Sequence, residues 1–76
     1  MMLSDARKDR DYIFESFAES FDHKSLLVGV GLSEGDSFYV VASSFFGSPI
    51  TIRLKNGQTF GLRKTEASFI KIKEIN

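Results

Sequence analysis

Apolar and polar residues alternate most regularly in the second half of the chain. Residues 50–54 read apolar, polar, apolar, polar, apolar, and Phe60 and Leu62 resume this period after a short gap. A period of two predicts two strands, each with one buried face. Between them, Asn56-Gly57 is a strong hairpin signal, and it predicts a two-residue type I′ turn in which both residues have positive φ.

Short turn signals lie on both sides of this hairpin. Gly47-Ser48-Pro49 predicts a turn before it, and Pro49 can occupy the first position of a strand because it has no N–H to donate. Lys64–Ala67 is too short for an independent helix and predicts one helical turn. Ile70 and Ile72 then restart the period of two, so a last strand is expected, ending over residues 73–76.

The first half of the chain predicts two further strands. Tyr12–Phe17 is rich in aromatic and β-branched residues, with Ile13 and Phe17 expected on one face and the other two aromatic residues on the opposite face. Ser37–Ala42 shows the same alternation. A count of five short strands follows for the whole chain.

The segment between these two strands predicts the main helix. Asp22–Val30 has an N-cap candidate at its start and an apolar stripe that includes Leu26. Gly31 is expected to end this helix in the left-handed region. Ser33–Asp36, with Gly35 inside it, predicts a turn.

At the start of the chain, Leu3–Ala6 predicts a single helical turn with Ser4 as its N-cap. Five short strands with tight turns favour a mainly β fold, a small barrel, because closure removes exposed sheet edges. The alternative is an open α+β sheet with the main helix across one face. In either arrangement, residues 1–76 are expected to form a single domain.

Composition narrows the class of protein. The chain has 76 residues, 42% of them hydrophobic, which allows one small domain with a thin core. Cysteine is absent, which excludes disulfides and thiolate metal sites and fits a reducing cytosol. No apolar run approaches the roughly 18 residues of a membrane span, and the charged start has no apolar region of a signal peptide. A cytoplasmic location is therefore expected.

Charge is balanced overall but unevenly distributed. Residues 1–38 carry four basic and eight acidic side chains, whereas residues 39–76 carry six basic and two acidic ones. The general interpretation is a set of solvated faces that keep the protein soluble. The more specific interpretation is a basic face for an acidic partner or a nucleic acid.

The sequence contains no constellation of catalytic residues. No nucleophile motif and no carboxylate pair in a context that separates their pKa values is present, so an enzyme is not expected. His23 is the single histidine, and metal sites usually need three or four clustered ligands. It is interpreted as an exposed helix residue, and the alternative is an incomplete surface site with Asp22 or Glu19.

The basic second half raises the question of RNA binding. Small barrels that bind RNA usually display aromatic side chains for base stacking, but here the strand aromatics are directed to the core. Phe45 and Phe46 lie in a polar loop and are expected either to fold back over a barrel end or to form an exposed contact site.

Four short motifs resemble the FeoA family, small cytoplasmic accessory proteins of bacterial ferrous iron transport. In chain order they are Leu3-Ser4-Asp5-Ala6, Val30-Gly31-Leu32-Ser33-Glu34-Gly35 after Leu26-Leu27, Gly47-Ser48-Pro49-Ile50, and Leu62-Arg63-Lys64-Thr65-Glu66-Ala67. Val30 stands where the family usually has Leu, and Ser48 stands where it usually has Asp. The order and separations of the motifs extend the resemblance over nearly the whole chain.

The resemblance implies an SH3-like barrel that is not an enzyme. It implies docking on the cytoplasmic GTP-binding part of FeoB, the membrane ferrous iron transporter, with contact to the membrane only through that partner. The family is often described as associated with transition metals, but the absence of Cys and the single His support no tight metal site, so no cofactor is expected beyond a weak association with a transition metal. No nucleic acid partner is expected. The alternatives are a small RNA-binding barrel that uses the basic second half, and a detached domain of a metal-dependent repressor.

The resemblance also suggests roles for individual residues. A cleft beside the main helix and the turn that follows it is expected to receive the partner, with contacts from Leu26, Leu32, Phe45, Phe46 and Arg63. Structural roles are expected for Gly31, Gly35, Gly47, Pro49, Asn56, Gly57 and Glu66.

Overall fold

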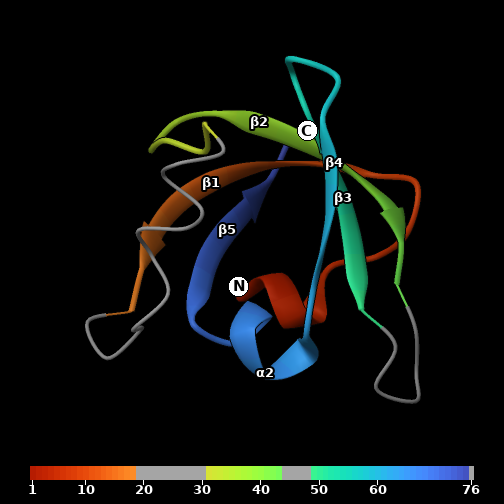
Figure 1. Cartoon of the computed structure of the whole chain (residues 1–76). Coiled ribbons are helices and arrows are strands. Elements are labelled where there is room, and N and C mark those ends of the chain that lie inside the picture. The colour runs from red at the N-terminus through yellow and green to blue at the C-terminus, as the bar shows by residue number, and fades with distance from the viewer. Residues whose placement is uncertain (19–30, 44–48, 76) are drawn as a thin grey trace.

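The computed structural model describes residues 1–18, 31–43 and 49–75 (Figure 1). Its elements are a 3₁₀ turn η1 (Leu3–Asp5), strands β1 (Asp11–Phe17), β2 (Ser37–Ala42), β3 (Ile50–Leu54) and β4 (Thr59–Leu62), a helical turn α2 (Lys64–Ala67) and strand β5 (Ile70–Glu74). All five predicted strands and the helical turn after β4 are confirmed. The predicted helix Asp22–Val30 and the loop with Gly47, Phe45 and Phe46 lie outside the described residues.

The five strands form one antiparallel sheet in the order β4-β3-β2-β1-β5. The sheet is strongly curved, so that β5 and β4 approach opposite sides of one interior (Figure 1). The extents of 25 × 25 × 22 Å are nearly equal in three directions, unlike those of a flat layer. The predicted small barrel of five strands is therefore confirmed.

The barrel closes through its helical turns. The hydrogen-bonded order of the sheet ends at β4 on one side and β5 on the other. The turn α2 connects these two end strands and contacts η1 at the bottom of the molecule in Figure 1. The chain start adds to the outer edge of β5, because the Met1 carbonyl accepts a hydrogen bond from Ile72 N (2.8 Å) and Met2 pairs with Lys71.

The buried side chains come from every described element and meet in one cluster. Alternate residues of the strands supply most of it, as the period of two predicts. The members are Leu3, Ala6, Tyr12, Phe14, Leu32, Phe38, Val40, Ile50, Ile52, Leu54, Leu62, Ala67, Ile70 and Ile72. Leu3, Ala6 and Ala67 belong to η1 and α2 or adjoin them, so the two helical turns complete the core that the sheet leaves open.

Phe17 lies on the core side of β1, whereas the sequence placed it with Ile13. Phe14 pairs with Ile72 and Ser16 with Lys71, so β1 contains one extra residue between these two pairs. This bulge reverses the face of every later residue of the strand. Phe17 therefore pairs with Ile70, and its ring lies 4.7 Å from the ring of Phe14, measured between centroids.

The β3–β4 hairpin is present, but its turn is not the predicted type I′. Gly57 has a φ of +89°, whereas Asn56 is not among the described residues with positive φ. Leu54 N donates to Gln58 O (2.8 Å) and Gly57 N to Leu54 O (3.0 Å), which defines a three-residue loop ending in a left-handed glycine. Asn56 instead accepts a hydrogen bond from Gln58 N through Oδ1 (2.9 Å). Its side chain thus stabilises a turn that does not require positive φ at Asn56.

Two further turn predictions can be compared with the structure. The turn Ser33–Asp36 is confirmed: Asp36 N donates to Ser33 O (3.0 Å), and Ser33 N donates to the Asp36 carboxylate (2.9 Å). The N-cap of η1 was predicted wrongly. It is Met2, not Ser4, because the extended pairing of Met2 with Lys71 places the start of the 3₁₀ turn one residue after Met2.

A buried phenol joins the segment after η1 to the core. Tyr12 is fully buried, and its hydroxyl accepts a hydrogen bond from Arg7 N (2.8 Å). We expect Tyr12→Phe to lower the free energy of unfolding by about 1–2 kcal/mol, because it leaves the Arg7 N–H without this acceptor. Urea denaturation measures this. Tyr39→Phe removes a hydroxyl from an exposed hydrogen bond to Asp9 and serves as the control, with a smaller expected loss. Equal losses would contradict this interpretation.

The hairpin turn provides a second test. Gly57→Ala places a Cβ on a residue with a φ of +89°, although no other atom lies within 4 Å of that Cβ. We expect a loss of about 1–2 kcal/mol in the free energy of unfolding, from backbone strain alone. The neighbouring exposed substitution Gln58→Ala is the control, and we expect it to cost less. A neutral Gly57→Ala in thermal or urea denaturation would show that the loop relaxes.

Candidate partner-binding groove

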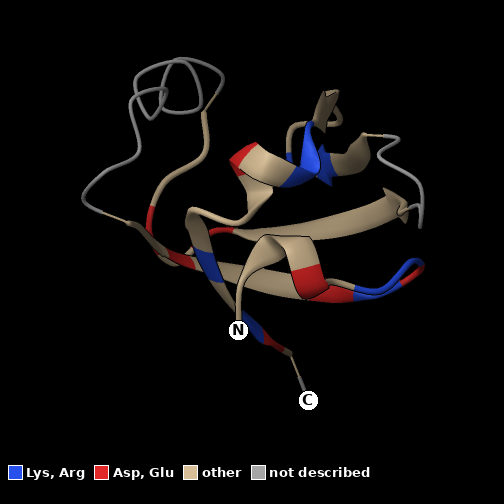
Figure 2. Ribbon diagram, turned by 90° about the horizontal axis from the view of Figure 1, so that it is seen from below, with Lys and Arg blue, Asp and Glu red and all other residues tan. Residues whose placement is uncertain are grey.

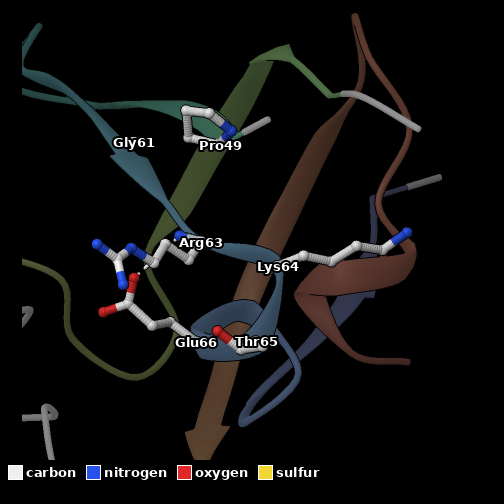
Figure 3. A pocket seen from close by; sticks show the side chains of 6 residues that line it. All are labelled: Pro49, Gly61, Arg63, Lys64, Thr65 and Glu66. Atoms are coloured by element: carbon white, nitrogen blue, oxygen red, sulfur yellow. Dashed lines mark hydrogen bonds between the residues drawn. The ribbon is translucent and has the colours of Figure 1, made fainter. Parts of the chain in front are cut away.

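Two adjoining hollows lie at the end of the barrel that α2 and η1 close. The first has a volume of about 580 Å³ and is lined by Pro49, Gly61, Arg63, Lys64, Thr65 and Glu66 (Figure 3). The second has a volume of about 590 Å³ and is lined by Ser4, Asp5, Ala6, Arg7, Lys8, Ser43, Ile50 and Lys64. Lys64 lines both hollows, and we call the two together the Lys64 groove.

The backbone around α2 holds the rim of the groove in place. Glu66 accepts a hydrogen bond from Arg63 N through Oε1 (2.9 Å), which is the reciprocal bond of a helix N-terminus. Ala67 N donates to Arg63 O (2.9 Å), and Ser68 Oγ donates to Thr65 O (2.6 Å). These local bonds explain the structural role expected for Glu66. In Figure 3 the side chain of Arg63 extends to the side where Glu66 lies, and that of Lys64 extends the opposite way.

Pro49 and Gly61 pack closely in the first hollow. A Cβ on Gly61 would lie 3.2 Å from the Cβ of Pro49, tighter than most contacts of real side chains. Gly61 therefore allows Pro49 to lie against β4. Gly61 was not predicted as a site residue, although a glycine inside a strand pattern often indicates close approach of another backbone.

The second hollow has an apolar floor and a basic side. Ile50 (2% exposed) and Ala6 (7% exposed) belong to the core, and each lines this hollow. Arg7 and Lys8 follow η1 and are exposed. The bond from Arg7 N to Tyr12 anchors this segment to the core, so the two cations project from a held backbone.

Four cations around the groove have no carboxylate partner in the described part of the chain. They are Arg7, Lys8, Arg63 and Lys64, and all four are exposed. The ion pair in the described residues joins Arg10 to Glu74 (3.2 Å), with both side chains about half exposed, and such pairs contribute little to stability. Figure 2 shows basic residues at the start of α2 and in the segment that follows η1.

The structure separates the residues that were expected to form one cleft. Arg63 lies in the Lys64 groove. Leu32 is 1% exposed and belongs to the core, so it offers a partner no surface. A Cβ on the neighbouring Gly31 would lie 3.8 Å from Asn56 Nδ2, at the tip of the β3–β4 hairpin and thus at the other end of β4 from Arg63. The other three contact residues, Leu26, Phe45 and Phe46, lie outside the described residues.

The expected structural residues can be located in part. Gly31 and Gly35 have φ values of +101° and +88°, so both occupy the left-handed region, as Gly57 does. Gly35 N donates to Phe14 O (2.9 Å), which fixes the Ser33–Asp36 turn against β1. Pro49 precedes β3 and lines the groove. Gly47 lies outside the described residues.

Chemically reactive arrangements are not found in the described ranges. No group of three or more His, Cys, Asp or Glu side chains that could hold a metal ion occurs within residues 1–18, 31–43 and 49–75. His23, Asp22 and Glu19 lie outside these ranges. The hydrogen bond from Tyr39 to Asp9 raises the pKa of Tyr39 above its ordinary value, and Tyr39 does not line the groove.

No helix within residues 1–18, 31–43 and 49–75 has the length and apolar character needed to cross a bilayer.

Solved structures with the same fold come from two groups of proteins. The chain is similar to FeoA from Chlorobium tepidum, with 25% identity, a TM-score of 0.86, and coverage of 100% of this chain and 71% of that one. It is also similar to an iron uptake regulatory protein (FeoA), with 24% identity, a TM-score of 0.83, and coverage of 99% and 96%. A manganese-dependent transcriptional repressor matches with 16% identity and a TM-score of 0.87, but the chain spans 41% of its length.

These likenesses confirm the SH3-like barrel. No curated protein sequence matches the chain. The family comparison is more specific, because the FeoA domain matches residues 1–74, which includes all four motifs identified in the sequence. The chain therefore belongs to the FeoA family, and this membership implies a role in ferrous iron transport.

Proposed function

We propose that this protein is a non-enzymatic accessory protein of bacterial ferrous iron transport that docks on the cytoplasmic part of a FeoB-type transporter. The observation that carries the proposal is the FeoA match over residues 1–74. Docking on this partner implies a cytoplasmic location, with contact to the membrane only through the transporter. The proposal includes no cofactor.

The geometry of the described residues supports binding of a partner protein rather than catalysis. The Lys64 groove is shallow and open, and its ionisable side chains are exposed or half exposed. Catalytic groups usually have pKa values displaced by burial and by close charged neighbours. The groove instead offers exposed charges around a small apolar floor, which suits a reversible contact with another protein.

The other two functions have less support. The likeness to the manganese-dependent repressor, at 16% identity, shows the fold alone. RNA-binding barrels stack bases on displayed aromatic side chains, and the described residues that line the groove include no aromatic one. No specific observation therefore favours a repressor domain or an RNA-binding protein.

Docking can be tested by NMR with the isotope-labelled chain and the isolated cytoplasmic GTP-binding domain of the transporter. We expect chemical-shift changes in fast exchange, with a dissociation constant of about 10 μM to 1 mM, because a small contact surface gives weak binding. The changes should concentrate at residues of the groove and of the segments that adjoin it.

The control partner is a soluble P-loop GTPase of similar size and net charge that belongs to no transporter. It should leave the spectrum unchanged. If the transporter domain causes no shifts at millimolar concentration, or if both GTPases cause the same shifts, docking on the transporter is wrong.

A further inference from the structure

We infer that the Lys64 groove binds an acidic, extended protein segment, rich in Asp and Glu. Where the segment is assigned to the transporter, the inference rests on the docking function proposed above. The class of ligand is derived independently, from the charges, the lining and the shape of the groove.

Charge is the first argument. Arg63 lines the first hollow, Arg7 and Lys8 line the second, and Lys64 lines both, and none of the four is in an ion pair with a described residue. Several cations without a carboxylate partner make the local potential positive, and a ligand with several carboxylates is attracted to it. An arginine guanidinium also matches a carboxylate through two parallel hydrogen bonds. The groove is therefore complementary to several negative charges in a row.

The acidic side chains at the groove do not cancel this charge. The Glu66 carboxylate accepts a hydrogen bond from the backbone N of Arg63, so one of its oxygens already has a partner at the start of α2. Asp5 is the other acidic lining residue and lies in η1. Four cations against two carboxylates leave the groove positive, although the protein as a whole has a net charge of zero.

The cations are divided between the two hollows. Arg63 lines the first, Arg7 and Lys8 line the second, and Lys64 lines both. A ligand that pairs with both sets of cations must reach from one hollow to the other, which suits an extended segment more than a compact ligand. Pro49 is exposed in the first hollow and can contact the apolar stems of the ligand's side chains.

The lining also distinguishes this ligand from two others. Grooves that bind proline-rich segments are lined with aromatic side chains, and single-stranded nucleic acids are held by base stacking on such side chains. The lining residues within 1–18, 31–43 and 49–75 include no Phe, Tyr or Trp. Among these residues the groups available for recognition are mainly the cations, which favours an acidic protein segment over RNA or a proline-rich segment.

The direct test uses a synthetic 12-residue peptide of alternating Glu, Asp and Gly, with an otherwise identical Gln and Asn peptide as the control. In titrations of the isotope-labelled chain at about 20 mM salt, we expect shifts of Ala6, Gly61 and Lys64 with the acidic peptide alone. Raising the salt to about 300 mM should weaken binding about tenfold, because exposed charges are screened over a few ångströms. No shift with the acidic peptide at millimolar concentration would overturn the inference.

Charge-reversal variants locate the site. Arg63→Glu combined with Lys64→Glu should weaken binding of the acidic peptide at least about tenfold. Arg63 contributes only its backbone N to the bond with the Glu66 carboxylate, so this change leaves the donor available. Lys71→Glu combined with Lys73→Glu changes the net charge equally at exposed residues of β5 outside the groove, and it should weaken binding less than about threefold. Equal weakening by both double variants would assign binding to diffuse charge and overturn the inference.

Two further measurements complete the test. If Arg63→Glu with Lys64→Glu disturbs the spectrum of the free chain, Arg7→Gln with Lys8→Gln replaces it on the other side of the groove, with the same expectation. Tighter binding of a 12-nucleotide uridine RNA than of the acidic peptide at the same residues would assign the groove to nucleic acid instead.

The transporter domain separates this inference from the docking proposal. If that domain binds the wild-type chain and the Arg63→Glu and Lys64→Glu double variant equally well, docking on the transporter stands. The assignment of docking to the groove is then wrong. Binding of the acidic peptide without binding of the domain would support the groove and refute docking on the transporter.

Discussion

The packing of η1 against α2 over the open side of the sheet is the contact on which this structure depends. Five short strands supply a curved sheet with one apolar face, but its end strands β4 and β5 are not hydrogen-bonded neighbours. An uncovered seam would leave core residues such as Ile50 and Leu62 in water. Leu3, Ala6 and Ala67 cover that seam from the two helical turns. Closure is therefore achieved by apolar contact, with the first two residues of the chain protecting the edge of β5.

This way of closing the barrel also creates the groove. A helical turn buries one side and exposes the other, and the segments that enter and leave η1 and α2 must run over the surface because their backbone groups need water or local partners. Arg7, Lys8, Arg63 and Lys64 lie in or beside these segments, so the seam of the barrel is bordered by cations from two distant parts of the chain. In this FeoA-family domain, the helical turns η1 and α2 complete the core and also border the Lys64 groove.

Local patterns allowed most elements to be predicted, and the errors arose where a tertiary contact changes a local rule. Ser37–Ala42 and Ile50–Leu54 were predicted with the observed bounds, since alternation depends only on the chain's own period. The face of Phe17 was wrong because a bulge in β1 is produced by pairing with β5. The turn type at Asn56 was wrong because its side chain bonds to Gln58 N. Of the residues that line the groove, only Arg63 was predicted to contact a partner, because no local pattern brings residues 4–8 and 61–66 together.

By itself, the sequence determined the class of fold, the places of the strands and turns, and the family, because these follow from residue types at short spacing. The sequence also contains two pairs of adjacent cations, Arg7 with Lys8 and Arg63 with Lys64. Only the tertiary structure decided that these two pairs border one groove, that Leu32 is inside the core, and that the barrel closes through α2 and η1. The physical reason is that closure joins residues about sixty positions apart, and such contacts depend on the packing of the whole core.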